Sequence, residues 1–337
     1  MGRFVLRRIL LTVPLVLAVA ALTFVLSHVV PADPARMLAG LNADESTVAA
    51  IRAEYGLDRP LVVQFGTYVG RLLQGDLGVA LLDQRPVAVN LADFFPATVE
   101  LTVFSMLLAL AAGIPLGVLA ATHRGRLADH LSRLFSLAGV AVPIFWTGIV
   151  LVVVFYAQLG WLPSGGQSHL LDGGDGSGRI TGMSTVDAAL AGDGPALADA
   201  LLHLLLPGAT LALPTLARVM RTTRASMVET LALPYVATAR AKGVPEFRVV
   251  YGHALRNALV PVVTITGLSF GYLLGGSVLV EKIFQWPGIG RYAYESITVL
   301  DYNSMLGVTL LATVAFLVVN LLVDVVHAAV DPMIRLG

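Results

Sequence analysis

Residues 237–261 read ATARAKGVPEFRVVYGHALRNALVP, a basic segment rich in small residues between two of the most apolar stretches of the chain. Pro234 favours the start of a helix and Gly243 favours its end, so we expect a helix at Tyr235–Lys242. Such a helix has only two turns, and helices of fewer than about 12 to 15 residues are marginal in water by themselves. It therefore needs a surface on which to dock.

A second helix is expected directly after the first. Pro245 suits its first turn, and Glu246 lies near its N-terminus, where the helix dipole favours an acid. One side of this helix should be lined by Phe247, Val250, Tyr251 and Ala254. An ordinary basic loop is the alternative, but the order helix, glycine, proline, helix and apolar segment favours a built helix pair.

Composition identifies the class of protein. The 337 residues are 56% hydrophobic and 13% charged, with a mean hydropathy of +0.80. Because soluble domains carry about 25% charged residues, these values indicate a membrane protein. The chain contains no cysteine, which excludes disulfides, thiol catalysis and cysteine-rich metal sites.

Six apolar runs are long enough to cross the hydrocarbon core, which takes about 20 helical residues. They are Ile9–Val30, Ala97–Ala121, Leu134–Leu159, Leu201–Met220, Ala258–Val280 and Met305–Val330. We therefore expect an all-α integral membrane protein with six transmembrane helices. The first run could instead be a signal peptide, but it continues well past the cleavage-like Ala18-Val19-Ala20, and signal peptides have apolar regions of roughly 7 to 15 residues.

The basic residues predict the orientation. Six spans place both termini on one side, and the segments on that side hold 14 of the 22 basic residues. By the positive-inside rule, the termini and residues 237–261 are cytoplasmic. The 14 residues are Arg3, Arg7, Arg8, Arg124, Arg126, Arg133, Arg218, Arg221, Arg224, Arg240, Lys242, Arg248, Arg256 and Arg335.

Three regions are expected along the chain. Residues 1–30 form the N-terminal tail and first span, residues 31–96 an extracytoplasmic helical cap, and residues 97–337 a five-helix core with a cytoplasmic loop at 221–257. In the cap, Asp44 can begin a helix at Glu45–Tyr55 that Gly56 ends, and a second helix follows Pro60. Its apolar face would consist of Leu61, Phe65, Tyr68 and Leu72. Residues 160–199 contain LDGGDGSGRITG and read as a loop with little apolar surface to bury, for which a ligand role is the alternative.

No motif for enzymatic chemistry is found. A phosphate-binding loop needs G-x-x-x-x-G-K-[ST], and neither Lys242 nor Lys282, the only two lysines, lies in one. His123 and His130 are the only close histidine pair, and a solvated basic face explains them better than a metal site. We expect no enzymatic activity, no metal and no cofactor bound by this chain.

Few ionisable residues fall within the spans, and each is a functional candidate. Glu100 lies near the outer end of the second span, and Asp324 and His327 lie near the inner end of the last. An interfacial or interhelical partner is one interpretation, and a proton relay in an ion-coupled carrier is the other.

Glycines recur at a spacing of four residues in two spans. Gly113 and Gly117 lie in the second span, and Gly267, Gly271 and Gly275 in the fifth. Such spacing lets helices approach closely, either within this chain or along a seam with a second membrane subunit. Prolines that can bend or break spans are Pro115, Pro143, Pro207, Pro214 and Pro261.

TARAKG at 238–243 followed by HALRNALVP at 253–261 resembles the coupling loop of permeases from binding-protein-dependent ABC importers. The closest similarity is to the dipeptide/oligopeptide/nickel family, in its dipeptide B-type subunit. Further matching motifs, in the expected order, are FVLRRIL, GLDRPLVVQF, GDLG, GIPLGVLAA, RASM and GGSVLVEKIFQWPGIGR. The broader pattern E-A-A-x-x-x-G would place a glutamate at Ala237, so here an acidic contact from that position is absent.

The resemblance implies a MetI-like permease fold in the bacterial inner membrane and transport of di- or oligopeptides, with nickel or another small solute as the alternative. It implies a second permease subunit, two ATPase subunits that use ATP and Mg, and an extracytoplasmic substrate-binding protein. A stand-alone ion-coupled carrier is the runner-up. The residues implied in coupling to the ATPase are Tyr235, Thr238, Ala239, Arg240, Lys242, Gly243, Glu246, His253, Arg256 and Asn257.

Overall fold

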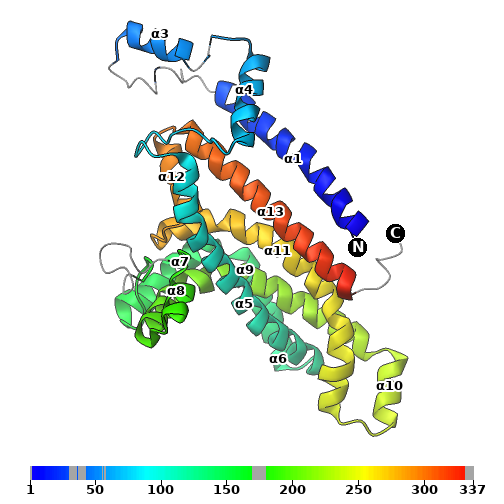
Figure 1. Cartoon of the computed structure of the whole chain (residues 1–337). Coiled ribbons are helices and arrows are strands. Elements are labelled where there is room, and N and C mark those ends of the chain that lie inside the picture. Colours follow the sequence, from blue (N-terminus) through cyan, green and yellow to red (C-terminus); the bar gives the residue numbers. More distant parts are fainter. Residues whose placement is uncertain are drawn as a thin grey trace. The chain divides into compact units, whose positions relative to one another are not determined.

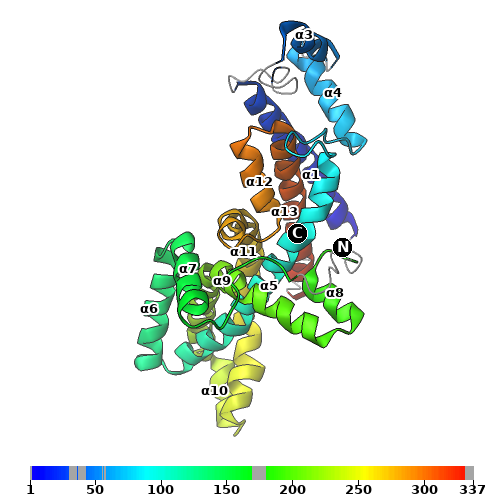
Figure 2. The same ribbon diagram turned by 90° about the vertical axis from the view of Figure 1, so that its left-hand side faces the viewer.

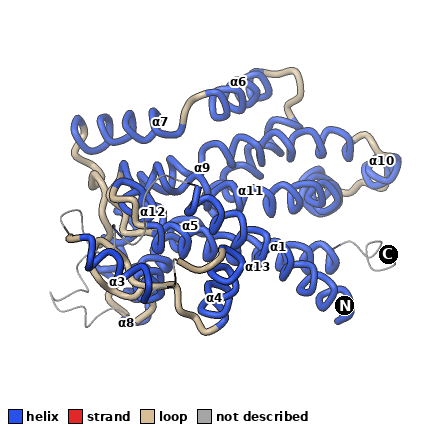
Figure 3. Tube along the Cα trace, turned by 90° about the horizontal axis from the view of Figure 1, so that it is seen from above, coloured by secondary structure: helices blue, strands red, loops and turns tan. Residues whose placement is uncertain are grey.

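The computed structural model describes residues 2–29, 36, 43–54, 56, 58–168 and 180–330 (Figure 1). Within these ranges the chain forms helices, turns and one isolated β-bridge between Val79 and Pro86, with no β-strand (Figure 3). The elements in chain order are α1 (Gly2–Val29), α3 (Glu45–Glu54), α4 (Leu61–Leu73), α5 (Val87–Thr122), α6 (Leu127–Ala141), α7 (Ile144–Leu151), η1 (Val152–Gln158), α8 (Ser184–Ala191), α9 (Gly194–Leu231), α10 (Pro234–Ala241), η2 (Arg248–Ala254), α11 (Leu255–Ile283), α12 (Ile289–Thr298) and α13 (Tyr302–Val330). The elements η1 and η2 are π-helical.

Two compact units divide the chain. The first consists mainly of residues 94–291 and 318–337, and the second of residues 2–93 and 292–317. Both α5 and α13 pass from one unit into the other. The division therefore differs from the three sequential regions expected from the sequence.

In the first unit, α9 is the central helix, and α6, α7, α8 and α11 all pack against it (Figure 2). The core contains Leu101, Leu204, Leu273, Phe284 and Trp286, all nearly inaccessible to solvent. The indole N–H of Trp286 donates to the carbonyl of Ala97 at 2.8 Å, which satisfies its one polar atom in this apolar setting.

In the second unit, aromatic side chains join α1 to α4. Phe24 lies 5.4 Å from Phe65 and 5.7 Å from Tyr68 between ring centroids. The predicted helix after Pro60 is confirmed as α4, and the predicted stop at Gly56 is confirmed by its φ of +64°. Tyr55, the expected last residue of the preceding helix, lies outside the described residues.

Four helices are long and apolar enough to cross a membrane, at Val87–Thr122, Gly194–Leu231, Arg248–Gly275 and Tyr302–Val323. A fifth span results if α6 with α7–η1, which meet at 105°, is counted as one. Within the described part of α1, the apolar segment is Thr12–Val25, which is shorter than the 18 residues required of a span. The described residues thus give four or five spans, against the six expected.

The expected span at Leu134–Leu159 is broken at Pro143, one of the prolines named as able to bend or break a span. The helix stops at Ala141, and Val142 is extended, with φ −77° and ψ 128°. Pro143 is the cause, because its ring disfavours helical backbone in the residue before it and it has no N–H to donate. The other four prolines of the expected set lie inside continuous helices.

The expectation of a loop throughout residues 160–199 was wrong in part. Residues 184–191 form α8, and α9 already begins at Gly194. Asp193 caps α9 by accepting from the N–H of Ala196 at 2.9 Å, so this aspartate begins a helix. Residues 169–179, which hold most of the Gly/Asp-rich motif, lie outside the described part.

Candidate functional site

The short basic helix is present as α10, at Pro234–Ala241, one residue from the predicted Tyr235–Lys242. Pro234 occupies its first turn after Leu233, which is extended. The helix packs against η2 and α9, and Figure 1 shows it beside the N-terminal part of the helix that becomes α11. Val236 is its one buried residue and anchors it.

The helix ends in a Schellman motif at Gly243. The N–H of Gly243 donates to the carbonyl of Arg240 at 2.9 Å, and that of Val244 donates to the carbonyl of Ala239 at 3.2 Å. Gly243 has a φ of +73°, which a residue with a side chain adopts only under strain. The predicted helix end at this glycine is confirmed.

Arg240 and Glu246 form a bidentate ion pair across this turn. The distances are 2.7 Å from Nη2 to Oε1 and 3.1 Å from Nε to Oε2. The Arg240 guanidinium lowers the pKa of the Glu246 carboxyl below its ordinary value. Arg240 thus has an acidic partner within its own chain.

The segment after Pro245 differs from the expected α-helix. Residues 246 and 247 are α-helical, and residues 248–254 form the π-helix η2, which runs directly into α11. A π turn holds an extra residue, so it breaks the i, i+4 face expected for this segment. Val250 and Ala254 are buried as predicted, but Phe247 and Tyr251 are exposed, with their rings 4.8 Å apart.

Tyr235 connects α10 to the start of α11. Its hydroxyl accepts from the side-chain amide of Asn257 at 2.7 Å and donates to the carbonyl of His253 at 3.4 Å. Three of the predicted coupling residues therefore lie together. Of the others, Thr238, Lys242 and Arg256 are exposed, and Ala239 is half-buried.

The spaced glycines meet different surroundings. A Cβ on Gly113 would lie 2.9 Å from Val219, and one on Gly117 would lie 2.6 Å from Thr223, so both glycines allow α5 to approach α9. Gly267 lies against Val323 in the same way. Gly271 is half-buried, and Gly275 has open space around it.

Buried acids of the first unit include one that the sequence analysis named. Glu100, for which an interfacial or interhelical partner was one interpretation, is 5% exposed and accepts from the backbone N–H and hydroxyl of Thr185 at 2.6 and 2.7 Å and from the Gln167 amide at 2.9 Å. Glu100 thereby caps α8. Asp324 and His327 have side chains outside the described part.

Glu281 and Asp129 are among the further buried carboxylates that the sequence analysis missed. Glu281 accepts from Thr98 and from the backbone N–H of Arg291, and Asp129 is surrounded by arginines of α6 and α9. Glu281 lies within the quoted motif GGSVLVEKIFQWPGIGR, which is the signal that could have identified it. Asp129 precedes Arg133 by one helical turn, a pattern that predicts only a surface pair.

These features describe a membrane-spanning helical chain that presents a short capped helix and lacks a phosphate-binding loop. The sequence matches the family described as binding-protein-dependent transport system inner membrane component over residues 113–336, and the N-terminal model of such components over residues 1–102. The chain belongs to this family.

Relatives and a solved structure agree with this assignment. The chain is 45% identical over 322 residues to the probable D,D-dipeptide transport system permease protein DdpB of Escherichia coli (strain K12), covering 96% of this chain and 94% of DdpB. It is 40% identical over 335 residues to the glutathione transport system permease protein GsiC of Salmonella paratyphi A, covering 99% of both. The fold is similar to an inward facing MetNI methionine ABC transporter, with a TM-score of 0.50, 16% identity, and coverage of 70% of this chain and 93% of that one.

The chain is therefore a permease subunit of a bacterial ABC importer, resides in the inner membrane, and has no ATPase site of its own. A permease of this class works with ATPase subunits and a substrate-binding protein.

Proposed function

We propose that this permease forms half of a transmembrane path for short peptides and pairs with a second, homologous permease. Six spans with cytoplasmic termini give the orientation, two partner ATPases use ATP and Mg, and α10 transmits their closure. The observation that carries the proposal is α10 itself: a two-turn helix fixed at both ends that leaves Tyr235, Thr238 and Arg240 on the surface.

Its surroundings support a docking role. Phe247 is 72% exposed and lies against the half-exposed Tyr251, beside the ion pair of Arg240 and Glu246. Exposed aromatic rings bordered by charged groups are typical of protein interfaces, where Tyr, Phe and Arg are enriched. Lys242 is exposed and has no ion-pair partner among the described residues, so it is available to an acid on the ATPase.

The connection to the spans explains how docking becomes movement. The N-terminal end of α10 follows α9 after two residues, and its C-terminal end leads through η2 into α11. A displacement of α10 therefore acts on two spanning helices that pack against each other. Reversing a 1:99 preference between two conformations takes about 5.5 kcal/mol, which ATP binding can supply through such a contact.

A cross-linking experiment tests the coupling role. Because the chain has no cysteine, Thr238→Cys introduces a single thiol on the exposed side of α10. In the assembled importer, we expect a disulfide to a cysteine in the ATPase groove, with a yield that changes on adding ATP. Trp161→Cys is the control, since it is exposed but outside the 221–257 loop. Equal yields from the two positions would reject the docking site.

The substrate proposal depends on the relatives. DdpB is named for a D,D-dipeptide and GsiC for glutathione, and both compounds are short peptides. We therefore expect the importer's ATPase, reconstituted with its binding protein, to be stimulated by short peptides. Stimulation by nickel ions and not by peptides would favour the metal alternative.

A further inference from the structure

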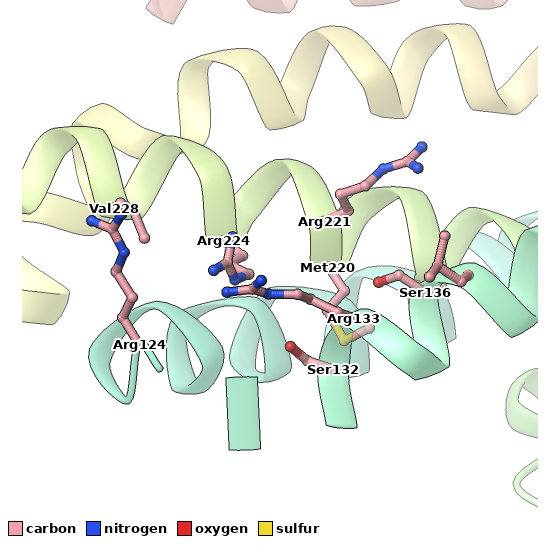
Figure 4. A pocket seen from close by; sticks show the side chains of 9 residues that line it. Arg124, Ser132, Arg133, Ser136, Met220, Arg221, Arg224 and Val228 are labelled. Carbon is pink, nitrogen blue, oxygen red and sulfur yellow. The ribbon is translucent and has the colours of Figure 1, made fainter. Parts of the chain in front are cut away.

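A basic cavity of about 410 Å³ lies between α6 and α9, within the first unit (Figure 4). No residue of α10 lines it. Its lining consists of Arg124, Ser132, Arg133, Ser136, Leu137, Met220, Arg221, Arg224 and Val228.

Four arginines but no acid line this cavity. The nearby carboxylate is Asp129, whose side chain is fully buried. It accepts from Arg133 Nη2 at 2.6 Å, from Arg224 Nη2 at 3.0 Å and from the N–H of Gly125 at 2.9 Å. Figure 4 shows the guanidinium groups of Arg133 and Arg224 next to each other. One carboxylate thus fixes two arginines and leaves the cavity strongly positive.

The remaining polar groups are available to a ligand. Within the described part of the chain, Arg124 and Arg221 have no ion-pair or hydrogen-bond partner, and neither does the Ser136 hydroxyl. Ser136 is only 5% exposed, and its hydroxyl lines the cavity, where a ligand can reach it. In Figure 4 Arg124 lies toward one end of the cavity and Ser136 toward the other, while the long Arg221 side chain is turned away from the Arg133–Arg224 pair.

The apolar part of the lining indicates where the anion comes from. Leu137 lines the cavity and is 64% exposed, and Leu134 on the same helix is equally exposed. Both belong to α6, which is part of the bent candidate span. An acyl chain can lie along these leucines while its headgroup enters the cavity, and guanidinium groups match phosphate oxygens in geometry and charge.

We propose that this cavity binds the phosphate group of an anionic membrane lipid. The phosphate lies against the basic wall of Arg133 and Arg224, which Asp129 holds in place, and Arg124 and Arg221 add unpaired positive charge to the cavity. The site requires only that the basic ends of α6 and α9 lie at a membrane surface. It is independent of substrate and of α10 docking.

The test uses the assembled importer purified in mild detergent and probed by native mass spectrometry with phosphatidylglycerol or phosphatidylcholine added. The variant Arg124→Gln/Arg221→Gln removes the two unpaired cations and leaves the Asp129 cluster intact. Arg126→Gln is the matched control, because Arg126 is an exposed arginine of the same turn that does not line the cavity. In a second measurement, the thermal unfolding of the wild type and both variants is followed with millimolar inorganic phosphate added.

Retention of phosphatidylglycerol over phosphatidylcholine, reduced at least fivefold in the double variant and unchanged in Arg126→Gln, would support a lipid site. If the wild type is stabilised by inorganic phosphate but retains no phosphatidylglycerol, the cavity binds free phosphate and the lipid proposal is wrong. Equal lipid retention and phosphate response in wild type and both variants would overturn the proposal. Loss of the ATPase subunits from the double variant would assign these arginines to a protein interface and also overturn it.

Discussion

Arg240 and Glu246 join the end of α10 to the start of the following turn across a left-handed glycine, so α10 is fixed by a contact within its own loop. Five residues separate them in sequence. The ion pair joins side chains on either side of the Gly243 turn, and the Schellman hydrogen bonds join backbone groups of the same turn.

The ion pair makes a pH-dependent contribution to the stability of this loop. Because Arg240 lowers the pKa of Glu246 in the folded state, the contribution is present above the ordinary pKa of 4.5 and is lost as pH falls through the lowered value. Both side chains are substantially exposed, so its size is about 0 to 1 kcal/mol and decreases with salt. We expect wild type to exceed Glu246→Gln in thermal stability at pH 7 and to lose this advantage as the pH falls through the lowered pKa of Glu246. A difference that stays constant with pH would contradict this assignment.

Gly243→Ala should strain the end of α10. A residue with a Cβ at a φ of +73° costs about 1 to 2 kcal/mol, and no neighbouring atom lies within 4 Å of the new methyl, so strain is the only effect. We expect normal membrane insertion, with ATP-driven uptake reduced relative to ATP hydrolysis. Gly252→Ala is the control, since Gly252 has open space and no positive φ. Undiminished uptake by Gly243→Ala would argue against coupling through α10.

Gly117→Ala and Gly275→Ala should separate packing within the chain from packing against a second permease. A methyl on Gly117 would overlap Thr223 and the carbonyl of Met220, so we expect a loss of about 1 to 3 kcal/mol in thermal stability. Gly275 has no neighbour within 4 Å, so its substitution should leave the isolated chain unchanged. If the seam hypothesis holds, Gly275→Ala will recover less of the second permease on purification; full recovery would place the seam elsewhere.

Glu100→Gln should destabilise the chain rather than block a proton. The amide cannot accept the hydrogen bonds from Thr185 and Gln167 as a carboxylate does, and the donors left buried cost about 1 to 3 kcal/mol. We expect a lower unfolding temperature and ATP-driven uptake in proportion to folded protein. The control is Glu229→Gln, an exposed glutamate of α9. Abolished transport at unchanged stability would revive the proton-relay hypothesis.

Local chemistry made part of this structure predictable. Pro234 and Gly243 bound α10 to within a residue because a proline at the start and a glycine at the end act through the backbone alone. Gly56 and the helix after Pro60 were predictable for the same reason. Runs of apolar residues identified the long spanning helices, although α5 and α9 begin well before the predicted spans.

Other features depend on tertiary contacts and could not be read locally. The sequence named five prolines as able to bend or break a span, and of these only Pro143 interrupts its helix. The role of Glu100 depends on Thr185, which lies 85 residues away, and Asp129 meets Arg224 across 95 residues. The π turn at η2 moved Phe247 and Tyr251 to the surface, against the face predicted from an α-helical period.

The π turn also determines where this segment can change length. One residue of α-helix corresponds to about 100° of rotation about the helix axis. A π turn absorbs its extra residue within one wider turn, so deleting that residue from η2 would leave Phe247 and Glu246 on nearly the same side of α11. Deleting a residue from the α-helical part of α11 would instead rotate the whole loop by that angle relative to the rest of the helix.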